Sequence, residues 1–233
     1  MDVAGLVITM PDTIYIPFFR IHIGRFLFLL LTFVSLFAVR PFLEGYAGIN
    51  LLMDLFVSGV LISGMYAVSQ KRSTFITGLI IGLPALAIQW VTYFVKTPVL
   101  PIVHELLMIA FSTYLGCAII RYIFREEEVT FDLIHGAICV YFLIGFMFTY
   151  IFSALEVAHP GSFAISKADL THSQYFSYFS YVTLTTLGYG DITPVSNTAR
   201  SMAVLESMSG QLYLAVTIAR LVGLHIAHSK KDS

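Results

Sequence analysis

Charged residues are scarce in this chain: of its 233 residues, 13 are Lys or Arg and 14 are Asp or Glu, together 12%. The formal net charge is −1, so neither a basic nucleic-acid surface nor an acidic tail is expected. Hydrophobic residues make up 58% of the sequence and the mean hydropathy is +0.84, far more apolar than a water-soluble domain requires. The composition therefore predicts an integral membrane protein that works within the membrane, in contact with lipids and not with nucleic acid.

Cysteine is also scarce. Cys117 and Cys139 are the two cysteines of the chain, and both lie in apolar runs, which predicts two packed thiols and neither a disulfide framework nor a metal cluster. Residues 1–20 lack a basic start followed by a cleavage site, so we expect no removable signal peptide. We likewise expect no cytoplasmic nucleotide- or calcium-binding domain after the last apolar stretch.

Six stretches are apolar enough to cross a membrane, for which a helix needs about 20 residues. The first is the weakest, because Arg25 and Arg40 enclose only a short uncharged run. Segment 11–21 mixes aromatic residues with Arg20, which predicts that it lies along the membrane interface. The distribution of Lys and Arg between the connecting loops places both termini in the cytoplasm of a multi-pass protein of the plasma (inner) membrane. The six predicted spans are roughly 22–42, 49–69, 74–95, 100–123, 130–156 and 200–226.

The connection between the last two spans, about 157–199, is then external and is the one long loop. From Ser173 to Thr185 it is aromatic and amphipathic, too apolar for a solvent loop and too short to span. We therefore expect a half-helix that dips into the membrane and returns. Such irregular backbone is tolerated only where it is buried in protein or lines a water-filled cavity.

The return segment has a specific motif: residues 185–191 read Thr-Thr-Leu-Gly-Tyr-Gly-Asp. Gly188 and Gly190 can adopt left-handed conformations at little steric cost, which lets successive backbone carbonyls point the same way. The motif resembles the selectivity filter of tetrameric potassium channels, with Leu187 where that family usually has Val. The resemblance implies passive conduction of K⁺, with no cofactor besides this permeant ion. The expected ion-binding residues are Thr186, Leu187, Gly188, Tyr189 and Gly190.

The resemblance also implies a set of residues that support the filter. Asp191 is expected just behind the outer mouth. We hypothesise that the Tyr178 hydroxyl bonds to it; the alternative is that Tyr178 faces lipid or a neighbouring subunit. Val182 stands where some bacterial channels carry an acid that pairs with the filter aspartate. Thr185 completes this set at the end of the short helix.

The last span, residues 201–223, resembles the inner helix of small bacterial potassium channels. Gly210 matches the family's hinge glycine, and the alternative is a glycine used for close helix packing. Leu214, Ile218 and Val222 follow on one stripe, which we interpret as cavity wall and inner constriction; a plain lipid-facing stripe is the alternative.

Two ionisable residues of this span are costly in lipid and therefore suggest a modulatory role. We expect Glu206 behind the filter, bonded to a hydroxyl of the short helix such as that of Thr183 or Thr185, with more effect on the filter than Arg220. Arg220 lies near the cytoplasmic end, where the simpler interpretation is that it snorkels to the interface.

Residues 22–126 occupy the position of a voltage-sensing domain, but residues 103–120 of the fourth span contain no Lys or Arg. Voltage sensing requires several cationic residues within the field, so we expect a degenerate sensor and weak voltage dependence or none. Asp54, His104 and Glu105 form either a proton-sensing cluster or interfacial groups without a role.

Two other classes of protein fit part of the pattern. Residues 188–191 also spell the G-x-G-D signature of intramembrane aspartyl proteases, with Asp54 as the conceivable partner, but such an enzyme needs both aspartates in facing helices so that they share a proton. Potassium transporters usually carry four filter-like loops in one chain, and this chain has one.

We therefore predict an all-α membrane protein that is not an enzyme, with six transmembrane helices, a re-entrant pore helix and a selectivity-filter loop. One loop cannot surround an ion, so the chain is expected to form a homotetramer. The expected divisions are an N-terminal segment 1–21, a four-helix sensor-like domain 22–126 and a pore domain 127–233.

Overall fold

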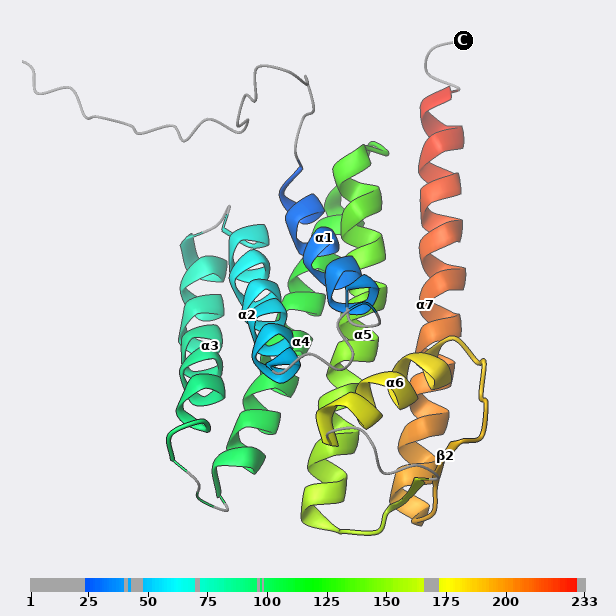
Figure 1. Cartoon of the computed structure of the whole chain (residues 1–233). Helices are drawn as coiled ribbons and strands as arrows, with labels where there is room; N and C mark the ends of the chain where they lie inside the picture. The colour runs from blue at the N-terminus through cyan, green and yellow to red at the C-terminus, as the bar shows by residue number, and fades with distance from the viewer. Residues whose placement is uncertain are drawn as a thin grey trace, which may run out of the picture.

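The computed structural model describes residues 24–39, 42, 48–69, 72–95, 97, 99–165 and 172–229 (Figure 1). The predicted interfacial segment 11–21 lies outside these residues, as do Arg40 and several other cations that set the predicted orientation. The described part is almost entirely helical, as predicted. Its elements are α1 (Arg25–Ala38), α2 (Ile49–Ala67), α3 (Arg72–Val91), α4 (Val99–Arg125), α5 (Phe131–Ala158), β1 (Phe163–Ile165), α6 (His172–Leu184), β2 (Ile192–Pro194) and α7 (Asn197–Ser229).

Five helices within the described ranges are long and apolar enough to cross a membrane: α2, α3, α4, α5 and α7. Helix α1 has 14 residues, which at 1.5 Å per residue covers about 21 Å of a hydrocarbon core about 30 Å thick. The weakest of the six predicted spans is thus also the shortest helix among them. A multi-pass membrane protein is supported, and the sixth span stays a prediction.

Helices α1 to α5 share one apolar core. Helix α4 lies beside α5 along most of its length, and α1 packs against α2 and α5 (Figure 1). Residues 126–130 join α4 to α5, so the predicted boundary at 126/127 separates two helices that bury their side chains against each other. Large core side chains from these helices include Phe26, Phe33, Leu61, Phe111, Leu115, Val140 and Leu143.

The start of α5 is fixed by two side chains. Thr130 caps the helix, its hydroxyl accepting a hydrogen bond from the Leu133 amide at 3.1 Å. Asp132 in the first turn pairs with Arg25 at 3.2 Å and also accepts a bond from the Phe26 amide. A single carboxylate therefore ties the beginning of α1 to the beginning of α5.

The chain between β1 and β2 leaves and returns at the same end of the bundle. The two strands pair antiparallel, with Ile165 opposite Ile192 and Phe163 opposite Pro194. Between them, the 13-residue α6 lies across α5 and α7 without the length to cross a membrane (Figure 1). The predicted half-helix is present, and its re-entry into the membrane stays a prediction.

The prediction of two packed thiols holds for Cys139, which is buried, and is wrong for Cys117, which is exposed. Cys117 lies on a face of α4 that the described neighbouring helices leave uncovered.

Candidate functional site: the loop after α6

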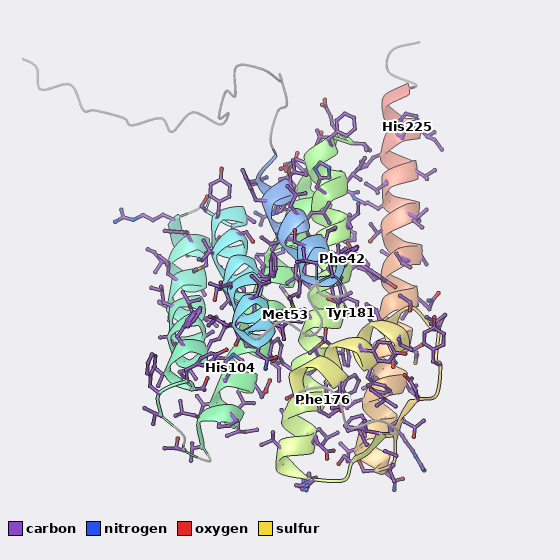
Figure 2. All side chains as sticks on the ribbon, in the orientation of Figure 1. Phe42, Met53, His104, Phe176, Tyr181 and His225 are labelled. Atoms are coloured by element: carbon purple, nitrogen blue, oxygen red, sulfur yellow. The ribbon has the colours of Figure 1, made fainter. Side chains whose placement is uncertain are left out.

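Aromatic side chains anchor α6 against α5 and β1. Phe176 (Figure 2) and Phe179 are buried. Both make edge-to-face contacts with Phe163, with ring centroids 5.0 and 5.4 Å apart. Phe179 contacts Phe152 of α5 in the same way. On another face of α6, the Tyr181 hydroxyl donates to the Phe142 carbonyl at 2.7 Å. The apolar composition that marked this segment in the sequence thus serves to fix α6 within the protein.

Two glycines allow the C-terminal end of α6 to approach its neighbours closely. A Cβ at Gly145 of α5 would lie 2.7 Å from the Tyr181 ring. A Cβ at Gly210 of α7 would lie 2.7 Å from the Leu184 side chain and 2.8 Å from the Leu184 carbonyl oxygen. Helix α7 runs without interruption through Gly210, so this geometry favours the close-packing interpretation of that glycine. Its role as a hinge stays a prediction.

The backbone of the loop alternates in handedness. Thr186, Gly188 and Gly190 have φ values of 60°, 57° and 80°. Thr186 is the one non-glycine residue with positive φ in the described part of the chain. Such a conformation is costly for a β-branched residue and marks a constrained site. The two glycines were foreseen from the motif; Thr186 was not, because its residue type carries no such signal.

The loop is closed onto the end of α6 by backbone hydrogen bonds. The amides of Leu187 and Gly188 both donate to the Val182 carbonyl, at 2.9 and 3.3 Å. The Thr185 hydroxyl donates to the Tyr181 carbonyl at 2.7 Å and so satisfies the end of the helix. Val182 therefore supports the loop through its carbonyl, while its apolar side chain offers no partner for Asp191.

The hydrogen bond that we hypothesised between Tyr178 and Asp191 is present. Burial and this bond to the Asp191 carboxylate raise the pKa of the Tyr178 phenol to about 12, because both favour its neutral form. The Tyr178 ring is also parallel to that of Tyr189, with centroids 6.5 Å apart. Asp191 in addition accepts a bond from the Ile192 amide at 3.1 Å. Tyr178 is thus directed at the loop of its own chain.

Glu206 is completely buried and lies beside Ser180, with its Oε1 2.5 Å from the serine hydroxyl oxygen. The partner is a hydroxyl of the short helix, as predicted, but it belongs to Ser180 and not to Thr183 or Thr185, the two examples expected. The register of α6 against α7 places Ser180 opposite Glu206 and Leu184, one turn later, opposite Gly210. The Thr185 hydroxyl instead donates to the Tyr181 carbonyl within α6.

The Ser180 hydroxyl also lies 2.6 Å from the Gly145 carbonyl oxygen. A hydroxyl has one hydrogen, and a carbonyl can only accept. Both contacts are satisfied together when the Glu206 carboxyl is protonated and donates to Ser180, which then donates to Gly145. These three residues join α5, α6 and α7 behind the loop.

Arg220 has defined partners within the chain; that it snorkels to the interface stays a prediction. One terminal nitrogen of its guanidinium donates to the carbonyls of Phe124 and Glu126, at 2.9 and 3.0 Å, and the group lies over the Phe124 ring. Phe124 lies in the last turn of α4 and Glu126 directly follows the helix, at the end where a helix is partly negative. Arg220 therefore links α7 to α4, a contact between elements that no local pattern could have predicted.

The loop and much of α7 are exposed in the single chain. Leu187 is 55% exposed and Tyr189 is 67% exposed. The predicted gate stripe, Leu214, Ile218 and Val222, is also exposed. Contact with lipid and contact with other subunits would both cover such an apolar surface.

Residues 137–225 match a family model described as "Ion channel". The match covers most of α5, all of α6, the loop and nearly all of α7. No curated protein and no solved structure matches the chain. The match supports an ion-channel function in a multi-pass membrane protein and points to a role in transport, not catalysis.

Proposed function

We propose that this chain is one subunit of a homotetrameric potassium-selective channel that conducts K⁺ passively through the loop after α6. The observation that carries the proposal is the positive φ at Thr186, Gly188 and Gly190 within the ion-channel match. In an extended strand successive carbonyls point to opposite sides, and alternation of handedness turns them to one side. A row of carbonyl oxygens facing the same way can replace the hydration shell of a cation.

The expected ion sites are the carbonyls of Thr186, Leu187, Gly188 and Tyr189, with the Thr186 hydroxyl. Gly190 and Asp191 complete the outer end. The closure of the loop onto Val182 and the Tyr178–Asp191 bond support the idea that its shape is held in place. The end of α6 also points its partly negative carbonyls toward the base of this loop, which favours a cation there.

Four copies are needed because one loop provides one side of a coordination shell. The exposed Leu187, the exposed Tyr189 and the long exposed face of α7 suit a surface that other copies cover around a rotation axis.

The proposed orientation has both termini in the cytoplasm of a plasma-membrane protein. The beginning of α1 and the end of α7 lie at one end of the bundle, and the β1–β2 pair lies at the other (Figure 1). This arrangement agrees with an even number of crossings and an external loop.

The aspartyl-protease alternative is disfavoured by where the two aspartates lie. Asp54 accepts hydrogen bonds from Tyr93 and Gln89 of the α3 region, whereas Asp191 lies in the exposed loop with Tyr178. Two carboxyl groups with separate partners on separate elements do not share a proton.

The test is reconstitution of the purified protein in liposomes, with flux measured in K⁺, Rb⁺ and Na⁺ and subunit number measured by native mass spectrometry. We expect a tetramer that passes K⁺ and Rb⁺ well and Na⁺ poorly. Equal Na⁺ flux, or full activity from a stable monomer, would contradict the proposal.

A further inference from the structure

A cavity of about 330 Å³ is lined by residues of α1 to α6 and by none of the loop after α6. Its volume falls in the range of about 300–1,000 Å³ typical of small-molecule sites. Met53 of α2 and His104 of α4 flank it (Figure 2). The polar side chains that line it are Asp54, Gln89, Thr92, His104, Glu105, Thr149 and Ser177.

Two buried side chains of this lining have an oxygen without a partner. Glu105 is 8% exposed; its Oε1 accepts a bond from Ser153 at 2.8 Å, and its Oε2 has no partner. Gln89 is 4% exposed; its amide nitrogen donates to the Asp54 carbonyl at 2.8 Å, and its Oε1 has no partner. The Nε2 atom of His104 in the same lining is also without a partner. Both orphaned oxygens are acceptors, so a donor is missing beside them.

The charge of the lining is one-sided. Asp54 and Glu105 contribute two carboxyl groups and His104 contributes an imidazole, while no Lys or Arg is among the residues that line the cavity. An ionised carboxylate buried without a counter-charge is costly, and a bound cation would supply both the charge and the missing hydrogen bonds.

The geometry favours an organic cation over a metal ion. Within the described ranges, no group of three or more His, Cys, Asp or Glu side chains is placed to hold a metal. The rest of the wall includes the aromatic rings of Phe37, Phe146 and Tyr150, which suit the apolar body and the positive charge of an organic ammonium.

We propose that this cavity binds a small organic ammonium ligand. Its N–H groups donate to Glu105, to the Gln89 amide oxygen and to Asp54, and its apolar part packs on the aromatic wall. The Glu105–Ser153 bond joins α4 to α5, and Ser177 belongs to α6, the helix that carries the loop. Occupancy is therefore expected to change ion flux; that consequence rests on the proposed function, whereas binding itself does not.

The sequence provides a reporter for the experiment. Trp90 is the single tryptophan of the chain; it follows Gln89, donates to the Ser58 hydroxyl and stacks on Tyr93, whose own hydroxyl bonds to Asp54. Benzylammonium titrated into the purified full-length protein should give a saturable change in Trp90 fluorescence. Benzyl alcohol, of similar size without the charge, should bind at least tenfold more weakly.

Glu105→Gln should weaken benzylammonium binding at least tenfold, because it removes the charge. Glu128→Gln removes an equal charge from an exposed position in the link between α4 and α5 and should leave binding unchanged. If Glu105→Gln does not fold, Asp54→Asn provides the same comparison. Benzylammonium should also raise the midpoint of thermal unfolding of the unmodified protein, and benzyl alcohol should not.

The proposal is overturned if benzylammonium gives no saturable signal, if benzyl alcohol binds equally well, or if the carboxyl variants bind as the unmodified protein does; water alone then satisfies these oxygens. Flux measured in parallel separates the two proposals. Saturable binding to a protein that conducts no K⁺ would support the ligand site and refute the channel proposal. Selective K⁺ flux without saturable binding would support the channel and refute the ligand site.

Discussion

Helices α4 and α7 are both long and apolar, but they are used in different ways. In the most apolar stretch of α4, 33% of the residues are buried inside the chain, against 11% in α7. Helix α4 packs Met108, Phe111 and Leu115 into the shared core, whereas α7 touches the rest of the chain through a few residues such as Glu206 and Gly210. Helix α4 is thus packed within the chain, whereas α7 leaves an apolar surface for lipid or, in the proposed tetramer, for other copies to cover.

The two helices also place a buried carboxyl group in comparable settings. Glu105 of α4 bonds to Ser153 of α5, and Glu206 of α7 bonds to Ser180 of α6. Glu105 borders a cavity, whereas Glu206 is enclosed where three helices meet behind the loop. A Glu–Ser pair between α4 and α5 therefore borders a cavity, whereas a second Glu–Ser pair is enclosed by close packing between α6 and α7.

The largest expected effect is the loss of close packing at α7. Gly210→Ala would place a methyl group 2.8 Å from the Leu184 carbonyl oxygen, and this backbone cannot move without shifting the end of α6. We expect loss of the tetramer, or at least a tenfold fall in K⁺ flux, measured by native mass spectrometry and liposome assay.

Gly223→Ala is the matched control, because a Cβ at Gly223 of the same helix has nothing within 4 Å in this chain. It should assemble and conduct like the unmodified protein. Equal behaviour of the two variants would refute the packing argument.

The next effect concerns selectivity. Tyr189→Asp removes the ring that lies parallel to Tyr178 and adds a charge beside Asp191. We expect the ratio of Na⁺ to K⁺ permeability, measured by ion-substituted flux, to rise at least tenfold. Tyr189→Phe keeps the ring and should keep the preference for K⁺. If the Asp variant stays as selective as the unmodified protein, the loop does not discriminate between ions.

A smaller effect is expected at Glu206. Glu206→Ala removes the partner of Ser180 and leaves a buried gap, which should lower stability by about 1–3 kcal/mol and reduce flux more than Arg220→Ala does. Glu206→Gln should be milder, because an amide can also donate to Ser180. Thermal unfolding and flux together provide the measurement. A Gln variant as damaged as the Ala variant would show that the ionised carboxylate is needed.

The sequence predicted what depends on local chemistry. The aromatic half-helix, the return loop and the left-handed positions at Gly188 and Gly190 follow from residue type and spacing alone. Most of the predicted spans also coincide with helices, because about 20 apolar residues leave few other structures in a membrane.

What the sequence could not provide is the register between helices. The partner of Glu206 depends on how α6 lies against α7, and the partner of Arg220 belongs to α4, far away in the chain. The cavity likewise exists only because α1 to α6 meet around Asp54 and Glu105. Residue spacing along one helix carries no information on these contacts.

The smallest expected effect is that of membrane potential, and it tests the comparison between α4 and α7 most directly. One elementary charge that crosses the membrane field contributes about 2.3 kcal/mol per 100 mV, so steep gating takes three to four charges in each subunit. Helix α4 has no Lys or Arg from Val103 to Ile120; Arg121 and Arg125 lie in its last turns. The end of α4 is moreover bonded to Arg220 of α7, and its middle is packed against α5. Helix α4 therefore has no cationic residue within the field, and its contacts hold it in place. Planar-bilayer recording in symmetrical K⁺ should therefore show open probability changing less than about tenfold over 100 mV, since one transferred charge alone would change it about 50-fold. An e-fold change every few millivolts would mean that the first four helices carry gating charge after all.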